Sequence, residues 1–139
     1  MATLIRPELS KKNKYHIDKH RHYELKHFCL QYPLWKRTYA ALLDLSIASS
    51  YMTGMPSGGG MSDTTAKSAI RRTYYADKIK LVEETAKEAD PYLYEYILKA
   101  VTEGLSYTYL RTIMEMPCGR DMFYDRYRRF FWLLNEARQ

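Results

Sequence analysis

The sequence predicts an all-α protein of one domain: an N-terminal helical hairpin, a long central helix and a C-terminal helix-turn-helix. Apolar residues recur every three or four positions along most of the 139 residues, which is the spacing of one helix face. No segment shows the alternation of apolar and polar residues that is typical of a strand. With 46% hydrophobic and 14% aromatic residues, the chain can bury a sizeable core.

The first segment, residues 1–14, is expected to be a mobile basic arm. It contains Arg6, Pro7, Lys11, Lys12 and Lys14. Such an arm can contact phosphates, although a solvated terminus is the commoner explanation.

Residues 15–45 are expected to form a helical hairpin. Leu25, Phe28 and Tyr32 share one helix face, and Pro33 suggests the corner between two helices. The second helix has a stripe of six residues at helical spacing: Leu34, Trp35, Thr38, Tyr39, Leu42 and Leu45.

All four histidines lie in this hairpin, at positions 16, 20, 22 and 27, near Cys29. The cluster raises the question of a metal site. However, it contains no Cys-x-x-Cys and no His-Glu-x-x-His spacing, so we expect no metal. The histidines are expected mostly on a basic face in contact with solvent.

Residues 46–61 are expected to form a flexible Gly/Ser linker, which ends in Pro56-Ser57-Gly58-Gly59-Gly60. A glycine triplet can cradle phosphates in nucleotide-binding proteins. Here neither a Lys-Ser nor a Lys-Thr pair follows at the required spacing, so nucleotide binding is rejected and no cofactor is expected.

Residues 62–103 are expected to hold the long helix and the helix that follows it. Ser62-Asp63 supplies the N-cap, and Asp90-Pro91 starts the next helix with a cap followed by proline. The apolar contacts of the long helix are assigned to five residues: Ala66, Ile70, Tyr74, Leu81 and Val82.

Residues 104–139 are expected to form the helix-turn-helix. Gly104 closes the preceding helix and Ser106 caps a short one, whose apolar residues are Tyr107, Leu110, Ile113 and Met114. Pro117 breaks the pattern and marks the turn. The final helix has an apolar stripe made of Phe123, Tyr127, Phe130, Leu134 and Ala137. Its opposite face has Arg120, Asp121, Tyr124, Asp125 and Arg128.

The stretch Phe130-Phe131-Trp132-Leu133-Leu134 is apolar most of the way round the final helix. A lone surface helix cannot hide so much apolar surface, so part of it must be buried. Burial against residues 20–45 and a homo-oligomer interface through this helix are both open alternatives.

The charge and composition bear on partners and compartment. A net charge of +6 and a pI near 9.2 favour a polyanionic partner. No apolar run approaches the roughly 20 residues of a membrane span. Two cysteines far apart, Cys29 and Cys118, and the lack of a secretory signal fit a reduced cytoplasmic compartment.

Catalysis is not expected. Serine, cysteine and histidine residues form no recognisable nucleophilic arrangement, and Cys118 beside Pro117 is better explained as a small turn residue. The carboxylates Glu83, Glu84 and Glu88 are spaced as on an ordinary solvated helix face. We therefore assign no catalytic residue.

Several motifs, in their order along the chain, resemble phage late-gene transcriptional activators of the RinA type. These motifs are Tyr32-Pro33, Ser62-Asp63-x-Thr65-Ala66, Glu103-Gly104-Leu105-Ser106-Tyr107 and Phe123-Tyr124 leading into Tyr127-Arg128-Arg129-Phe130. The resemblance covers roughly residues 20–138. Those proteins end in a helix-turn-helix similar to region 4 of sigma-70 factors. The turn at 115–119 is about two residues longer here.

The resemblance implies a DNA-binding face. Arg120, Asp121, Tyr124 and Arg128 would face the major groove, with Ser106 and Tyr107 near the flanking backbone and Arg111 in the same set. Arginine suits guanine edges, and the hydroxyls of tyrosine and serine suit phosphates.

The function expected from this face is a phage or prophage regulator that binds double-stranded DNA and acts on host RNA polymerase in the bacterial cytoplasm. Two alternatives stay open. One is a small-terminase-like DNA-packaging protein. The other is a non-DNA interaction protein that inhibits a host nuclease or polymerase.

Overall fold

A computed structural model describes residues 12–52 and 63–139, and it is all-α, as the sequence predicts. These residues contain six helices and no strand. The helices are α1 (Lys19–Leu30), α2 (Tyr32–Met52), α3 (Asp63–Ala89), α4 (Tyr94–Glu103), α5 (Tyr107–Thr112) and α6 (Arg120–Ala137). None of the described helices is long and apolar enough to span a membrane.

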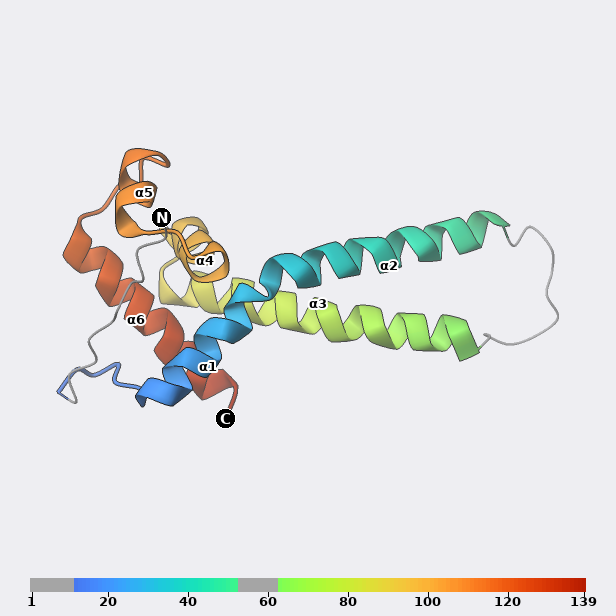
Figure 1. Cartoon of the computed structure of the whole chain (residues 1–139), viewed down its shortest axis with the longest axis horizontal. Coiled ribbons are helices and arrows are strands. Elements are labelled where there is room, and N and C mark those ends of the chain that lie inside the picture. Colours follow the sequence, from blue (N-terminus) through green and yellow to red (C-terminus); the bar gives the residue numbers. More distant parts are fainter. Residues whose placement is uncertain (1–11, 53–62) are drawn as a thin grey trace.

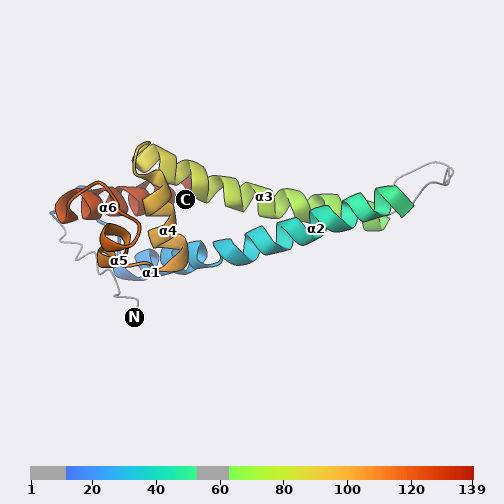
Figure 2. The same cartoon turned by 90° about the horizontal axis from the view of Figure 1, so that it is seen from above.

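The helices form a head and a projecting arm (Figures 1 and 2). The arm is an antiparallel pair made by α2 and the first half of α3, which extends well away from the rest. The head contains α1, α4, α5, α6 and the second half of α3. The C-terminal half of α3 contacts both α4 and α6, so this helix connects the arm to the head core.

The hairpin predicted over residues 15–45 is wrong in its pairing. Helix α2 pairs with α3, whereas α1 leads into α2 with only a bend between them (Figure 1). Gln31 keeps helical backbone angles, and its carbonyl accepts a 3.0 Å bond from the Trp35 amide. Pro33 lies in the first turn of α2, where its missing donor costs nothing, so it does not reverse the chain.

The arm is held by one stripe of each helix, and the stripes differ from those predicted. On α2, Trp35 and Leu42 are buried, but Leu34 and Leu45 are 53% and 64% exposed. On α3, the predicted contacts Ile70 and Tyr74 are 69% and 53% exposed. The predicted Val82 is fully buried and Leu81 packs against the core, and the inward residues that were not predicted are Tyr75, Ile79 and Ala86. Apolar residues lie all round these helices, so periodicity alone does not select the buried face.

The base of the arm is closed by a lysine among aromatic rings. The Lys78 ammonium lies 4.2 Å from the ring centre of Tyr74, 5.3 Å from that of Trp35 and 5.9 Å from that of Phe28. Such cation–π contacts are attractive, so Lys78 links α3 to both α1 and α2.

The aromatic stretch of α6 is part of the head core. Phe130, Phe131 and Leu134 are essentially fully buried, while Trp132 and Leu133 are partly buried. Burial within the same chain is thus the alternative that the structure favours, and the contacts of α6 are with α1, α3 and α4. Little apolar surface remains on this part of α6 for another subunit.

The end of the chain is fixed to α1. Arg21 donates from Nε to Oδ1 of Asn135 at 2.8 Å and from Nη2 to the carbonyl of Arg138 at 3.1 Å. The guanidinium of Arg138 lies 3.5 Å from the ring centre of Phe28. These contacts hold the last turn of α6 against the N-terminal helix.

His22 departs from the solvent-exposed histidine face predicted for α1. It is 6% exposed, and its ring lies edge-on to Phe131 with ring centres 4.8 Å apart. The physical reason is spacing, because His22 lies three residues before the buried Leu25 and so shares its face. In the described part of the chain, no group of three His, Cys, Asp or Glu residues could hold a metal.

Burial of His22 gives a testable pH dependence. Desolvation, aided by the charge of Lys26, lowers the pKa of His22 from 6.5 to about 4. Neither ring nitrogen has a hydrogen-bond partner among the described residues. The unfolded chain therefore binds the proton first, and stability falls as the pH drops from 6.5 towards 4. We expect about 3 kcal/mol of unfolding free energy to be lost across this window.

The measurement is urea unfolding at a series of pH values, with His22→Leu as the comparison. The variant lacks the titrating ring, so its stability should fall by less between pH 6.5 and pH 4. Parallel curves for the two proteins would show that His22 is protonated equally in the folded and unfolded states.

Two predicted segments lie largely outside the described residues. These are the basic arm, of which residues 1–11 are not described, and the glycine-rich part of the linker, residues 53–61. Residues 46–52, predicted as the start of the linker, belong to α2 instead.

Candidate nucleic-acid interface

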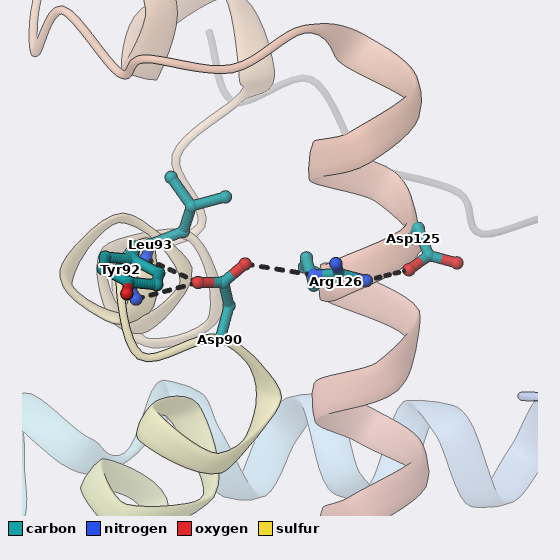
Figure 3. A network of polar contacts seen from close by, with 5 residues as sticks. All are labelled: Asp90, Tyr92, Leu93, Asp125 and Arg126. Carbon is teal, nitrogen blue, oxygen red and sulfur yellow. Dashed lines mark hydrogen bonds and ion pairs between the residues drawn. The ribbon is translucent and has the colours of Figure 1, made fainter.

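The candidate interface is built on α4, α5 and α6, which are anchored at Asp90. This aspartate ends α3, and its Oδ1 accepts from the amides of Tyr92 at 2.8 Å and Leu93 at 3.0 Å. Its Oδ2 accepts from Nε of Arg126 on α6 at 3.0 Å (Figure 3). The prediction that Asp90 is the N-cap of the next helix is wrong, because α4 starts at Tyr94 with Leu93 as its N-cap, and Asp90 caps the turn before it.

Arg126 connects two carboxylates. Besides Asp90, its Nη1 donates to Oδ2 of Asp125 at 2.6 Å (Figure 3). The Asp90 side chain is only 6% exposed, while that of Arg126 is 34% exposed. The hydrogen bond to Asp90 is the main reason why the pKa of Arg126 is raised. Arg126 therefore orients α6 against the α3–α4 junction and is not available to a ligand.

Removing this anchor should destabilise the head. Asp90→Ala loses the cap and leaves Arg126 without its buried partner, so we expect a cost of about 1 to 3 kcal/mol in urea unfolding. Asp90→Asn keeps an acceptor for the two amides and should cost less. Asp77→Ala, at an exposed position of α3, is the control. Equal stability of all three variants would contradict an anchoring role.

The connection from α4 to α5 is as the sequence predicts. Gly104 has a left-handed φ of 69°, and its amide donates to the carbonyl of Ala100, which closes α4. Ser106 caps α5, because its side-chain oxygen accepts from the Tyr109 amide at 3.1 Å. Glycine and serine suit these two positions for clear steric and hydrogen-bonding reasons.

The turn between α5 and α6 is closed by its own backbone and by Arg111. The Met116 amide donates to the Leu110 carbonyl at 3.0 Å, and Nη1 of Arg111 donates to the Met116 carbonyl at 2.6 Å. Glu115 has a φ of 55°, which reverses the chain. Met116 then inserts fully into the core. The predicted contact of Ile113 is wrong, because α5 ends at Thr112 and Ile113 is 64% exposed.

Helix α6 has two distinct faces over its first half. Phe123 and Tyr127 are buried, and they lie on the side that contacts the core. Of the predicted interface residues, Arg120 and Asp121 are exposed and Arg128 is partly exposed, whereas Tyr124 packs against the core beside Phe123. Gly119 is the N-cap of this helix and has extended backbone angles. Because glycine has no side chain, no side-chain cap covers the first turn of α6.

An aromatic cluster joins α5 to the start of α6. The ring centre of Tyr107 lies 5.8 Å from that of Phe123 and 6.2 Å from that of Tyr124. The guanidinium of Arg120 lies 5.2 Å from the Tyr107 ring centre. This cation–π contact holds the Arg120 guanidinium over the Tyr107 ring of α5, although Arg120 remains exposed. It orients a cation at the outer edge of α6.

The predicted site residues consequently fall into two groups. Arg120 and Asp121 are exposed at the start of α6, and Tyr124 and Arg128 are partly exposed further along it. Ser106, Arg111 and Tyr107 bond to the backbone, as cap, as turn closure and as donor to the Cys118 carbonyl. Arg111 is nevertheless an exposed residue.

Two residues of this face escaped the sequence reasoning. Thr108 is exposed in the first turn of α5 and Met122 is 45% exposed between Asp121 and Phe123. The position of Thr108, a hydroxyl residue two places after the Ser106 cap, could have identified it. Nothing in the sequence pointed to Met122, because methionine in a helix usually belongs to the core.

The electrostatics of this region are moderately positive. Residues 104–139 contain six arginines and four carboxylates. Arg126 and Arg138 are engaged within the chain, whereas the buried Nε of Arg128 has no hydrogen-bond partner among the described residues. Arg120 has a cation–π contact with Tyr107 but forms no ion pair among the described residues, and it is exposed.

The thiols do not form a reactive centre. Burial raises the pKa of both Cys29 and Cys118, which keeps the thiols protonated and poorly nucleophilic at neutral pH. Both cysteines are buried and free.

A function for this chain has to be inferred from its own residues and geometry. Comparison with protein-family models, curated proteins and solved structures yields no match for this chain.

Proposed function

We propose that this protein is a phage or prophage transcriptional regulator that binds double-stranded DNA through α5 and α6. The observation that carries the proposal is the division of α6 into two faces. Phe123 and Tyr127 anchor its inner face, while Arg120 and Asp121 are exposed and Tyr124 and Arg128 are partly exposed. A helix that reads DNA needs this combination of a fixed inner face and a free outer face.

In this proposal the first half of α6 enters the major groove. Arg120 and Arg128 supply the donors that suit guanine edges, and the exposed Met122 suits the methyl group of thymine. The Tyr124 hydroxyl is suited to a phosphate. Asp121 accepts from the amino group of cytosine or excludes acceptors, so it contributes to sequence discrimination.

Helix α5 would lie across the DNA backbone beside the groove. Its first turn has the exposed hydroxyl residue Thr108, and the exposed Arg111 lies one further turn along, whereas the Tyr107 hydroxyl donates to the Cys118 carbonyl at 3.5 Å. Thr108 and Arg111 would contact phosphates, which set the register of α6 without reading bases. The net charge of +6 is favourable for such contacts.

The regulatory role rests on the resemblance to RinA-type activators, which also suggests host RNA polymerase as a partner in the bacterial cytoplasm. A packaging protein of the small-terminase kind is less well supported, because the candidate DNA-binding helices lie at the C-terminal end of the chain. The main alternative function is that of a non-DNA interaction protein. Exposed apolar residues near the turn, Tyr109 and Ile113, would suit a protein partner.

The experiment is selection of bound DNA from a library of random duplexes with the full chain, followed by fluorescence anisotropy on the enriched sequence. The proposal expects one enriched motif, and binding that weakens with added salt and is tighter than binding to a scrambled duplex. Absence of any duplex binding at low ionic strength would favour the interaction protein. Binding without enrichment would contradict sequence-specific regulation.

A further inference from the structure

The outer half of α2 is apolar on every side although only one side touches α3. Residues 39–48 contain a single charged residue, Asp44. Leu42 is buried at the contact with α3, while Leu43, Leu45 and Ile47 are 37%, 64% and 49% exposed. A helix that is hydrophobic all round is normally buried all round. This part of the arm therefore has more apolar surface than its partner helix covers.

The exposed residues of α2 form a stripe at coiled-coil spacing. Leu34, Ala41, Leu45 and Ala48 are separated by seven, four and three residues, so they lie along one side of the helix, and all four are exposed. This stripe is distinct from the seam through Trp35 and Leu42 that contacts α3. Helix α2 thus has one apolar stripe that α3 covers and a second apolar stripe that is exposed.

The facing helix has a matching exposed surface at the same level of the arm. Ile70 and Tyr74 lie one turn apart on α3 and are 69% and 53% exposed. A shallow depression of about 410 Å³ is lined by these two residues with Ala69, Thr73 and Asp77. A side chain from outside the hairpin could be accommodated there.

The charges on the arm are complementary. Asp44 on α2 is acidic, whereas the exposed residues Lys67 and Arg71 on α3 are basic. Among the described residues neither Asp44 nor Arg71 forms an ion pair. Both groups are therefore free to pair with a neighbour.

Asp44 and Arg71 also lie at about the same height along the arm. The Lys78 ammonium on α3 lies 5.3 Å from the Trp35 ring centre on α2, and the two helices are antiparallel. Nine residues outward from Trp35 is Asp44, and seven residues back from Lys78 is Arg71. A two-fold axis through that height would place Asp44 of each copy beside Arg71 of the other. Contacts of this reciprocal kind define an isologous dimer.

We propose that the arm binds a second copy of this chain, arm against arm, so that two helical hairpins form a four-helix bundle. Each copy brings the same unsatisfied α2 stripe and the same exposed α3 face, and one pairing covers both. Bundles of this kind bury apolar stripes at heptad spacing. The interface is remote from α5 and α6 (Figure 1), so the inference does not depend on DNA binding.

The first test is the mass of the purified full chain in solution. Sedimentation equilibrium should give twice the 16.5 kDa chain mass at micromolar concentrations, with dissociation on dilution. Leu45→Glu should shift the protein to monomer, because it places a charge in the middle of the stripe. Ile113→Glu is the matched control, since Ile113 is also 64% exposed but lies in the head. It should leave the dimer intact.

The second test exchanges the paired charges. Asp44→Arg and Arg71→Asp should each weaken dimerisation by at least tenfold, and the double variant should recover most of the loss. A monomer at all concentrations would overturn the proposal. So would a dimer that tolerates Leu45→Glu, because its interface would then lie elsewhere. Circular dichroism on each variant shows whether the helices are still folded.

Discussion

Replacing both Arg120 and Arg128 by alanine should weaken specific DNA binding by about 1 to 3 kcal/mol for each arginine that contacts a base. Arg120 is exposed and Arg128 is partly exposed, and neither belongs to the buried core. Their loss should therefore remove donors to the DNA without disturbing the core. Fluorescence anisotropy on the selected duplex measures the affinity, and circular dichroism should show unchanged helical content.

The control for this variant removes the same charge from another surface. Arg37 on α2 and Lys80 in the second half of α3 are both exposed, and both lie outside α5 and α6. The double variant Arg37→Ala, Lys80→Ala should retain nearly all of the specific affinity. An equal loss in both double variants would mean that net charge alone governs binding, which contradicts the proposed groove face.

The second large effect is expected in the head core, where Phe130→Ala should cost about 3 to 5 kcal/mol of unfolding free energy. Phe130 is fully buried on α6, and its ring lies 5.1 Å from that of Phe131. Truncation leaves a cavity at the point where α6 contacts the other head helices. Urea unfolding monitored by circular dichroism measures the change.

Tyr92→Ala is the control, because Tyr92 is 92% exposed in the turn before α4 and its truncation should change stability by less than about 0.5 kcal/mol. Trp132→Ala should have an intermediate effect, since Trp132 is only partly buried. A near-zero cost for Phe130→Ala would mean that α6 does not lie in the core as described.

Local signals in the sequence predicted much of the secondary structure. Ser106 and Gly104 mark helix ends through effects that depend only on nearby backbone, namely a side-chain cap and a left-handed φ. The core face of α6 was also predictable, because polar residues occupy the opposite side of its first half. Where one side of a helix is clearly polar, periodicity identifies the buried side.

The pairing of the helices could not be predicted in the same way. The interior of α2 was partly misassigned because Leu34 and Leu45 are as apolar as the buried Trp35 and Leu42. Pro33 was taken as a corner, yet proline in a first helical turn is compatible with a mere bend. Which helix covers which stripe depends on contacts between residues far apart in the chain, and a single sequence does not display them.

The candidate site likewise has features that the sequence predicts and features that it does not. The outer face of α6 follows from its periodicity. In contrast, the bond from Arg111 to the Met116 carbonyl and the pairing of Arg126 with Asp90 depend on the turn and on the tertiary fold. Composition does not distinguish one arginine from another. The structure separates the arginines that bond within the chain from those that do not.

The most direct test of the central proposal is to map the DNA contact on the folded chain by NMR. Uniformly ¹⁵N-labelled protein is titrated with the selected duplex, and the amide shifts are followed residue by residue. The account predicts that the large shifts cluster at the start of α6, around Arg120, Tyr124 and Arg128, and in the first turn of α5. Large shifts confined to the α2–α3 arm, or no shifts at low ionic strength, would contradict it.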